Sequence, residues 1–138
     1  MKLTIIGFGE AGRAIAEGLR GEAKAPEISC FDIKTLDSTQ AEVIEQAAAS
    51  LKVRNCLTLA EAVEGATMLI STVTAGSALD VASAVRDLSP AAEAFFDMNS
   101  VAPGTKRAEA ELLNSAGIAY VDTAVMAPIH PRLHKTPM

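Results

Sequence analysis

The chain has few of the features that mark secreted, fibrous or metal-stapled proteins. Its 138 residues include 2 cysteines, no tryptophan and 4% aromatic residues. Two cysteines without C-x-x-C spacing exclude a disulfide scaffold and predict reduced thiols in a cytoplasmic location. A chain of this length buries enough surface to form a core without such cross-links.

Long hydrophobic runs and excess positive charge are also missing. The first apolar run, residues 3–6, is cut off by glycines, so we expect neither a signal peptide nor a membrane span there. With 12 basic and 17 acidic residues the net charge is −5, which disfavours nucleic acid and anionic membranes as partners. The content of 49% hydrophobic and 21% charged residues is typical of one folded domain.

Short apolar segments alternate with helical patterns along the chain. The strands are expected at residues 2–6, 28–32, near Val53, and at 68–73, 94–99 and 119–122. Helices are expected at residues 11–20, about 40–49, from Thr58 to Gly65, through Leu79 to Leu88, and from Pro103 to near Gly117. Because parallel strands need long return connections, this alternation predicts an α/β fold with a doubly wound, mainly parallel six-stranded sheet and helices on both faces.

A G-x-G-x-x-G motif lies directly between the first expected strand and the first expected helix. Gly7 permits the tight turn, Gly9 lets the backbone approach a pyrophosphate, and Gly12 lets helix and strand pack closely. The amino terminus of the helix offers free N–H groups to the same pyrophosphate. The motif therefore predicts a dinucleotide site of the Rossmann type, formed by Gly7, Phe8, Gly9, Glu10, Ala11 and Gly12.

An acidic residue follows at the spacing that such a site requires. Asp32 lies 20 residues past Gly12, at the end of the second expected strand, where a carboxylate accepts hydrogen bonds from the adenosine ribose. Ile33 and Lys34 complete this part of the expected cofactor site. The charge of Asp32 disfavours a 2′-phosphate and thus favours NAD, but Lys34 and Arg13 offset it, so NAD and NADP both stay open.

Several longer segments resemble the β-hydroxyacid dehydrogenases, which include 3-hydroxyisobutyrate and 6-phosphogluconate dehydrogenases. Besides the glycine motif, these segments are Phe31-Asp32, Ser71–Thr74, Asp97–Pro103 and Gly117–Val125, and the likeness covers nearly the whole chain. The resemblance implies an NAD(P)-dependent oxidoreductase that transfers hydride between the nicotinamide and a small hydroxy acid or related carbonyl compound. It also implies cofactor contacts at Val73 and Thr74.

The same resemblance places a substrate site after the last two strands. It implies that a small, anionic substrate contacts Asn99, Ser100, Val125 and Met126. Asn99 stands where many members of the family have a hydroxyl residue. Met126-Ala127-Pro128 replaces the usual Ser-Gly-Gly, so the substrate is not identified.

The general acid/base of this family is a lysine in a second, helical domain through which the enzymes usually form homodimers. On this basis residues 1–125 are the dinucleotide-binding domain, and the Pro/His-rich residues 126–138 lead toward a helical domain absent from this chain. We therefore expect the catalytic lysine beyond Met138, a homodimeric full-length protein, and no activity from this chain alone. No catalytic residue is assigned within it.

Some features allow other interpretations. His130 and His134 have the spacing of metal ligands on a helix, but Pro131 separates them, so no metal site is predicted. Together with Arg132 they would bring positive charge to the mouth of the substrate pocket. Two further functions remain open: a non-catalytic module that senses NAD(H), and an imine reductase with the same fold.

Overall fold

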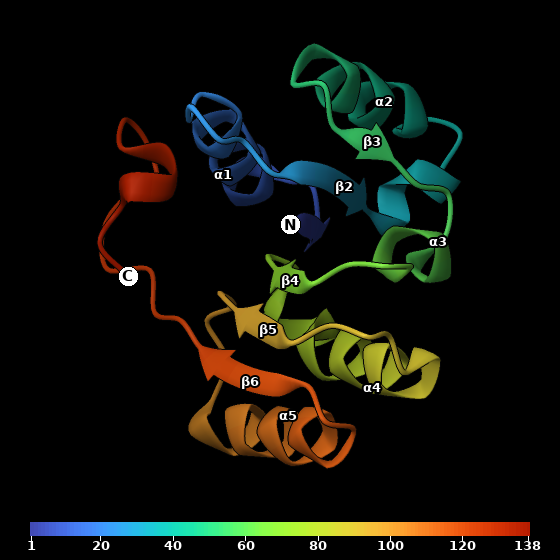
Figure 1. The fold of residues 1–138 in the computed structure, drawn as a ribbon, viewed down its shortest axis with the longest axis vertical. Coiled ribbons are helices and arrows are strands. Elements are labelled where there is room, and N and C mark those ends of the chain that lie inside the picture. The colour runs from blue at the N-terminus through green and yellow to red at the C-terminus, as the bar shows by residue number, and fades with distance from the viewer.

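The computed structural model describes residues 1–138 and contains one six-stranded sheet. The strand order is β3-β2-β1-β4-β5-β6, and every neighbouring pair is parallel, so the predicted doubly wound fold is confirmed (Figure 1). The strands are β1 (Lys2–Ile6), β2 (Glu27–Phe31), β3 (Arg54–Asn55), β4 (Met68–Ser71), β5 (Ala94–Asp97) and β6 (Ala119–Asp122).

The connections between the strands are helical, as expected. The α-helices are α1 (Glu10–Arg20), α2 (Ala41–Ser50), α3 (Leu59–Val63), α4 (Ala78–Leu88) and α5 (Pro103–Ser115). Three short 3-10 helices were not predicted: η1 (Ile33–Leu36), η2 (Ala75–Ser77) and η3 (Leu133–Lys135). None of the helices has the length and apolar character needed to cross a membrane.

The strand boundaries differ from the expected ones at the carboxyl edge of the sheet. Strands β4 and β5 each end two residues earlier than the apolar pattern suggested, and Val53 lies just before β3. The ladder continues for one residue beyond β4 and β5 through the N–H groups of Thr72 and Met98, and then the chain turns away. The apolar residues beyond the strand ends therefore belong to the loops that form the site.

Two apolar clusters hold the helices on opposite faces of the sheet. Because adjacent side chains of a strand point to opposite faces, Ile5 belongs to the cluster under α1 and α2, and Ile6 to the cluster under α3, α4 and α5. Both side chains are at most 2% exposed. Strand β1 is thus buried on both faces, as its uninterrupted apolar sequence predicted.

Two helix starts follow from local chemistry. The Thr58 Oγ1 accepts a hydrogen bond from the Glu61 N–H at 3.2 Å, and the Glu61 carboxylate accepts one from the Leu57 N–H at 3.1 Å. This capping arrangement begins α3, and Gly65 follows its end with a φ of +66°. Helix α5 begins with Pro103, whose missing N–H costs nothing in the first turn.

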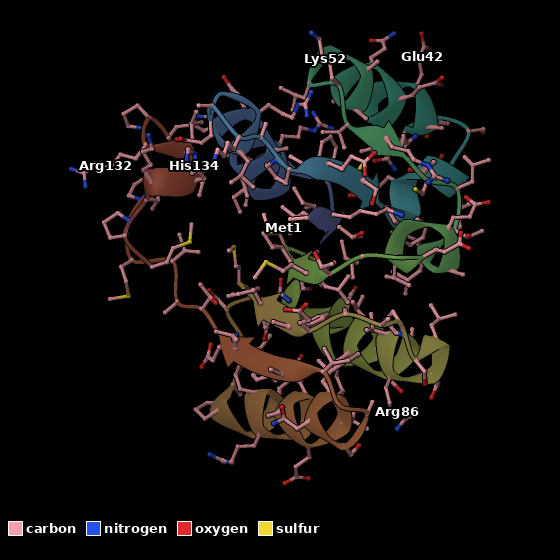
Figure 2. All side chains as sticks on the ribbon, in the orientation of Figure 1. Met1, Glu42, Lys52, Arg86, Arg132 and His134 are labelled. Carbon is pink, nitrogen blue, oxygen red and sulfur yellow. The ribbon has the colours of Figure 1, made fainter.

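The tail after β6 returns across the molecule to α1 (Figure 1). Ile129 packs against the cluster under α1, and the buried Thr136 donates a hydrogen bond to the Ile129 carbonyl at 3.0 Å. His134 lies in the tail next to α1 (Figure 2). Its imidazole occupies the space beside Gly18, which has no side chain, and its Nε2 lies 3.0 Å from Glu22 Oε1. Apart from η3, the tail has no helix or strand, in line with its three prolines.

Candidate functional site

The switch point of the sheet lies between β1 and β4. The strand order runs outward from these two central strands, so the loops that follow them lead in opposite directions at the carboxyl edge, where open α/β sheets bind their ligands. Three segments bring the predicted cofactor residues to this edge. These segments are Gly7–Gly12 after β1, Asp32–Lys34 after β2, and Val73-Thr74 after β4.

The three glycines of the motif differ in what surrounds them. Gly7 has a φ of +90°, and a Cβ there would lie 2.5 Å from the Thr72 carbonyl oxygen. A Cβ on Gly12 would lie 3.0 Å from Thr72 Oγ1 and 3.1 Å from the Ile5 side chain, so this glycine lets α1 approach β1. No atom lies within 4 Å of a Cβ built on Gly9. Gly9 therefore faces open space where a phosphate has room to approach the backbone.

The amino terminus of α1 has no side-chain cap. Gly9 is its N-cap residue, and the following N–H groups of Glu10 and Ala11 lie in the first turn, where they have no partner within the helix. The Glu10 side chain is exposed. Phe8 differs from the rest of the motif, because its side chain is fully buried and its N–H is bonded to Asp32. The helix start therefore fits an anion, with backbone groups as the donors.

Asp32 connects the glycine turn to the end of β2. Its Oδ2 accepts a hydrogen bond from the Phe8 N–H at 2.7 Å, and its Oδ1 accepts one from the Lys34 N–H at 2.9 Å. The residue is 8% exposed. A carboxylate has about four acceptor positions, so Asp32 keeps capacity for ribose hydroxyls while it holds the turn. The sequence predicted the ligand role and missed this structural one.

Thr72 is a further residue of this site that the sequence analysis did not assign. Its Oγ1 donates a hydrogen bond to the Gly7 carbonyl at 2.7 Å and so joins the end of β4 to the glycine turn. The sequence could have indicated this role, because Thr72 places a hydroxyl group directly after the central strand β4. The next two residues follow the strand end at the carboxyl edge: Val73 is half-buried and Thr74 is exposed.

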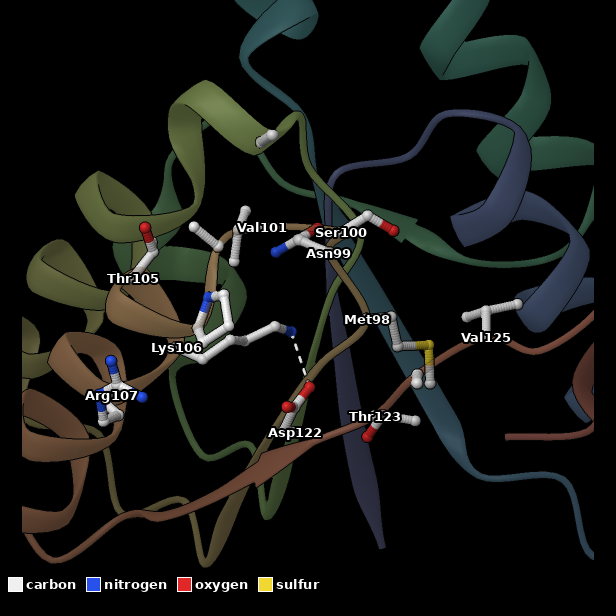
Figure 3. A pocket seen from close by; sticks show the side chains of 14 residues that line it. Met98, Asn99, Ser100, Val101, Thr105, Lys106, Arg107, Asp122, Thr123 and Val125 are labelled. Atoms are coloured by element: carbon white, nitrogen blue, oxygen red, sulfur yellow. Dashed lines mark ion pairs between the residues drawn. The ribbon is translucent and has the colours of Figure 1, made fainter.

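A second hollow lies at the β5–β6 end of the same edge. It has a volume of about 910 Å³ and lies between the loop after β5, the first turns of α5 and the loop after β6 (Figure 3). Asn99, Ser100 and Val125 line this cleft. Met126 does not line it, is 73% exposed, and donates its N–H to the Pro137 carbonyl.

Asn99 is held firmly but keeps one end of its side chain free. Its N–H donates to Asp97 Oδ1 at 2.9 Å, and its side-chain amide bonds to the Ser71 hydroxyl, also at 2.9 Å. The residue is 7% exposed and its Oδ1 has no partner. A hydroxyl both donates and accepts, so either end of the amide suits Ser71, and the other end is available to a ligand in the cleft.

Three charged residues line the cleft, Lys106, Arg107 and Asp122, and the sequence analysis assigned none of them to the site. The Lys106 Nζ lies 2.7 Å from Asp97 Oδ2 and 2.9 Å from Asp122 Oδ1 (Figure 3). Burial alone would lower its pKa, but the two carboxylates outweigh burial and raise the pKa of Lys106. It therefore stays protonated near neutral pH. The position of Lys106 could have been predicted from Pro103, because a helix that begins at Pro103 places Lys106 one turn later, next to the end of β5.

The basic residues of the tail do not reach the cleft, contrary to our expectation. None of His130, Arg132 and His134 lines it, and η3 packs on α1 instead. The contact between His134 and Glu22 lies beyond the carboxyl end of α1, whereas the glycine motif lies at its amino end. The reason is steric, because the notch at Gly18 accepts the imidazole. No group of three or more His, Cys, Asp or Glu side chains is placed to hold a metal ion.

The fold and the switch-point site define the class: a Rossmann-type domain of the oxidoreductases that bind NAD(P). Residues 2–95 match the profile of a family described as NADP oxidoreductase, coenzyme F420-dependent. The chain belongs to this family. No curated protein matches the chain in sequence.

Solved structures with the same fold agree with this assignment. A conserved hypothetical protein from Sinorhizobium meliloti 1021 is 30% identical over 99% of this chain and 45% of its own, with a TM-score of 0.87. The 3-hydroxyisobutyrate dehydrogenase of Mycobacterium tuberculosis is 21% identical over 93% of this chain and 41% of its own, with a TM-score of 0.75. An imine reductase from Myxococcus stipitatus, solved with NADP+, is 18% identical over 92% of this chain and 42% of its own, with a TM-score of 0.72.

These likenesses confirm the fold relationship to the β-hydroxyacid dehydrogenases that the motifs indicated. The chain spans less than half the length of each of the three proteins.

Proposed function

We propose that this chain binds NAD(P) at the switch point and orients the nicotinamide toward the cleft at the β5–β6 end. The observation that carries this proposal is the open space at Gly9, at the uncapped start of α1 and beside Asp32. An extended anion needs this combination of free N–H groups, close backbone approach and a nearby acceptor for the ribose.

Each part of the dinucleotide has a partner in this arrangement. The N–H groups of Glu10, Ala11 and Gly12 would hold the pyrophosphate, and Asp32 would accept from the adenosine ribose, flanked by Ile33. Val73 and Thr74 would pass along the nicotinamide ribose. When bound, the nicotinamide supplies the acceptor or donor of a hydride.

We propose that NAD is preferred over NADP. The Asp32 carboxylate lies at the ribose position and disfavours a 2′-phosphate. Two nearby cations offset this repulsion in part: Arg13, whose Nε donates to the Phe8 carbonyl at 2.8 Å, and Lys34. Lys34 is exposed and is the remaining cation of this segment.

The cleft would hold the second reactant, a small hydroxy acid or the corresponding carbonyl compound. Asn99 and Ser100 would contact it, Val125 would close one side, and Lys106 and Arg107 would contribute positive charge. Because Lys106 is tied to two carboxylates, the proton-transfer group would come from outside these 138 residues. Residues 1–125 would then bind the cofactor, residues 126–138 would lead to a second domain, and this chain alone would not turn over substrate.

An imine substrate is the second candidate. The Asp122 side chain, 59% exposed, lies in the cleft and offers a carboxylate that a cationic imine could contact, while Lys106 at 2.9 Å and Arg107 offset its charge. Replacing Asp122 by asparagine in the full-length enzyme would lower activity toward imines and raise it toward hydroxy acids if this second candidate is correct. No change in the ratio of the two activities would favour the hydroxy acid.

The cofactor proposal is tested by titrating the chain with NADH and NADPH, using nicotinamide fluorescence. We expect saturable binding of both, tighter for NADH. Gly9→Ala leaves the fold intact, since its methyl group meets no protein atom, but it fills the space for the phosphate and lowers affinity at least about tenfold.

Gly21→Ala is the matched control, since Gly21 follows the opposite end of α1, has a φ of −77°, and its added Cβ would meet only backbone oxygens at 3.4 and 3.8 Å. Its affinity should equal that of the wild type. Equal affinity of Gly9→Ala and Gly21→Ala, or no saturable binding by the folded wild type, would contradict the proposal.

A further inference from the structure

A buried carboxyl group, Glu109, lies directly behind the cleft and has no cation as a partner. It belongs to α5, one turn after Lys106, and is 1% exposed. The Tyr120 hydroxyl lies between two carboxyl groups, 2.7 Å from Asp97 Oδ2 and 3.0 Å from Glu109 Oε2. The second oxygen of Glu109, Oε1, is buried without a partner.

The geometry of these three groups requires a proton on Glu109. A hydroxyl has one proton, so Tyr120 can donate to only one of the two carboxyl groups. Asp97 takes it at the shorter distance and also accepts from Lys106 at 2.7 Å, as an ionised carboxylate does. Glu109 can then approach the tyrosine oxygen only as a donor, which means as a neutral acid.

The pKa directions agree with this distribution of protons. Burial, which raises the pKa of Asp97, is outweighed by hydrogen bonds from its neighbours, so its pKa is lowered. Burial and the nearby Asp97 raise the pKa of Glu109 to about 7. Glu109 therefore gains or loses its proton near neutral pH.

The charged and titratable groups around Glu109 come from three elements. Asp97 faces it from β5, Tyr120 from β6, and Lys106 lies on its own helix with Asp122 beyond. Helix α4 packs on α5 through an apolar cluster and brings no charge to this side. The charged residues of α4 lie elsewhere: Asp80 in a separate surface hollow, and Arg86 in an ion pair with Asp87.

Asp97 connects this proton to the cleft. Its Oδ1 holds the Asn99 N–H at 2.9 Å, and its carbonyl oxygen accepts from the Thr123 N–H at 2.9 Å. Both of these residues line the cleft. Ionised Glu109 would compete for the Tyr120 proton and place a second buried negative charge beside Asp97, so that Asp97 would lose a donor.

We propose that Glu109 is a positioning residue for the cleft: its proton keeps the Tyr120 hydroxyl directed at Asp97, and Asp97 then fixes the Asn99 segment. Loss of this proton loosens that segment. The functional meaning rests on the proposed role of the cleft as the site of the second reactant. The structural coupling itself does not depend on any ligand.

The coupling is tested by NMR spectroscopy of the labelled chain between pH 5 and 9, without ligand. We expect the carboxyl carbon of Glu109 to titrate near pH 7, and the backbone amide resonances of Asn99 and Thr123 to shift with the same midpoint. In Glu109→Gln the amide group donates to Tyr120 at every pH. The two backbone resonances should then stay at their low-pH positions throughout.

Glu111→Gln is the matched control, because it lies on the exposed side of the same helix and should leave the midpoint unchanged. Two results would overturn the inference. One is an Asn99 resonance that does not move with pH in the wild type, and the other is the same midpoint in Glu109→Gln. Either result leaves the cofactor proposal intact, because no dinucleotide takes part in the measurement.

Discussion

At the β1–β4 end of the carboxyl edge, backbone groups form the site, whereas at the β5–β6 end ionised side chains form it. Around Gly7 and Gly9 the important features are a positive φ, an open approach and free N–H groups. Around Asp97, Lys106 forms ion pairs with two carboxylates, and the Tyr120 hydroxyl lies between Asp97 and the buried Glu109. Backbone N–H groups do not titrate, whereas the structure at the β5–β6 end depends on which of Glu109, Tyr120 and Asp97 carries each proton. We therefore expect the two ends to respond differently to substitution and to pH.

The largest effect is expected when the buried charge at the β5–β6 end loses its partner. Lys106→Met leaves Asp97, which is fully buried, without a cation and beside Asp122 in the neighbouring strand. The free energy of unfolding, measured by urea denaturation at pH 8, should fall by about 4 kcal/mol. Part of the loss should return at lower pH, where Asp97 takes up a proton.

Lys34→Met is the control at the other end of the edge, since this side chain is exposed. It should change the free energy of unfolding by less than about 0.5 kcal/mol. Equal losses of unfolding free energy in Lys106→Met and Lys34→Met would show that the ion pairs at the β5–β6 end stabilise the protein no more than an exposed charge does.

The second-largest effect is a dependence of stability on pH, which we expect at the β5–β6 end only. Glu109 has an ordinary pKa of 4.5 when unfolded and a pKa of about 7 in the folded protein, where burial and Asp97 raise it. Its contribution to stability is therefore complete below pH 4.5 and is lost as the pH rises through about 7. Relative to Glu109→Gln, the wild type should lose about 3 kcal/mol of unfolding free energy across this interval.

Denaturant unfolding of both proteins at several pH values measures this difference directly. Titrations elsewhere in the chain cancel between the two proteins. A difference that stays constant from pH 5 to 8 would mean that Glu109 is ionised throughout, contrary to the contact with Tyr120.

The smallest effect is expected at the β1–β4 end. Thr72→Val keeps the shape of the side chain but removes the hydrogen bond to the Gly7 carbonyl. The free energy of unfolding should fall by about 1 kcal/mol, equally at pH 6 and pH 8. Thr74→Val, at an exposed position, should cost less. A loss of unfolding free energy in Thr72→Val that depends strongly on pH would contradict the difference proposed between the two ends.

The two ends also differ in how far the sequence predicts them. The turn at Gly7 is readable because a positive φ and close backbone approach demand particular residue types at fixed spacing. The same holds for the capping residues at Thr58 and for Pro103 at the start of α5. These requirements are local, so a short segment contains all the information.

The network behind the cleft could not be predicted in this way. Glu109, Tyr120 and Asp97 come from three elements, and their partnership depends on the register of β5 and β6 and on how α5 rotates over them. A glutamate within a helix ordinarily indicates an exposed position. The irregular structure of the tail was predicted, but the position of its basic residues was predicted wrongly, since the fit of His134 against Gly18 exists only after folding.

The central claim, that the switch point binds the dinucleotide through backbone groups, is tested most directly by mapping amide resonances during a titration with NADH. We predict that the N–H resonances of Gly9, Ala11, Gly12 and Lys34 shift most and saturate together. Those of Glu109, Tyr120 and the tail residue Leu133 should remain close to their starting positions. Saturable shifts confined to the β5–β6 end or to the tail, with Gly9 and Ala11 unmoved, would contradict the account.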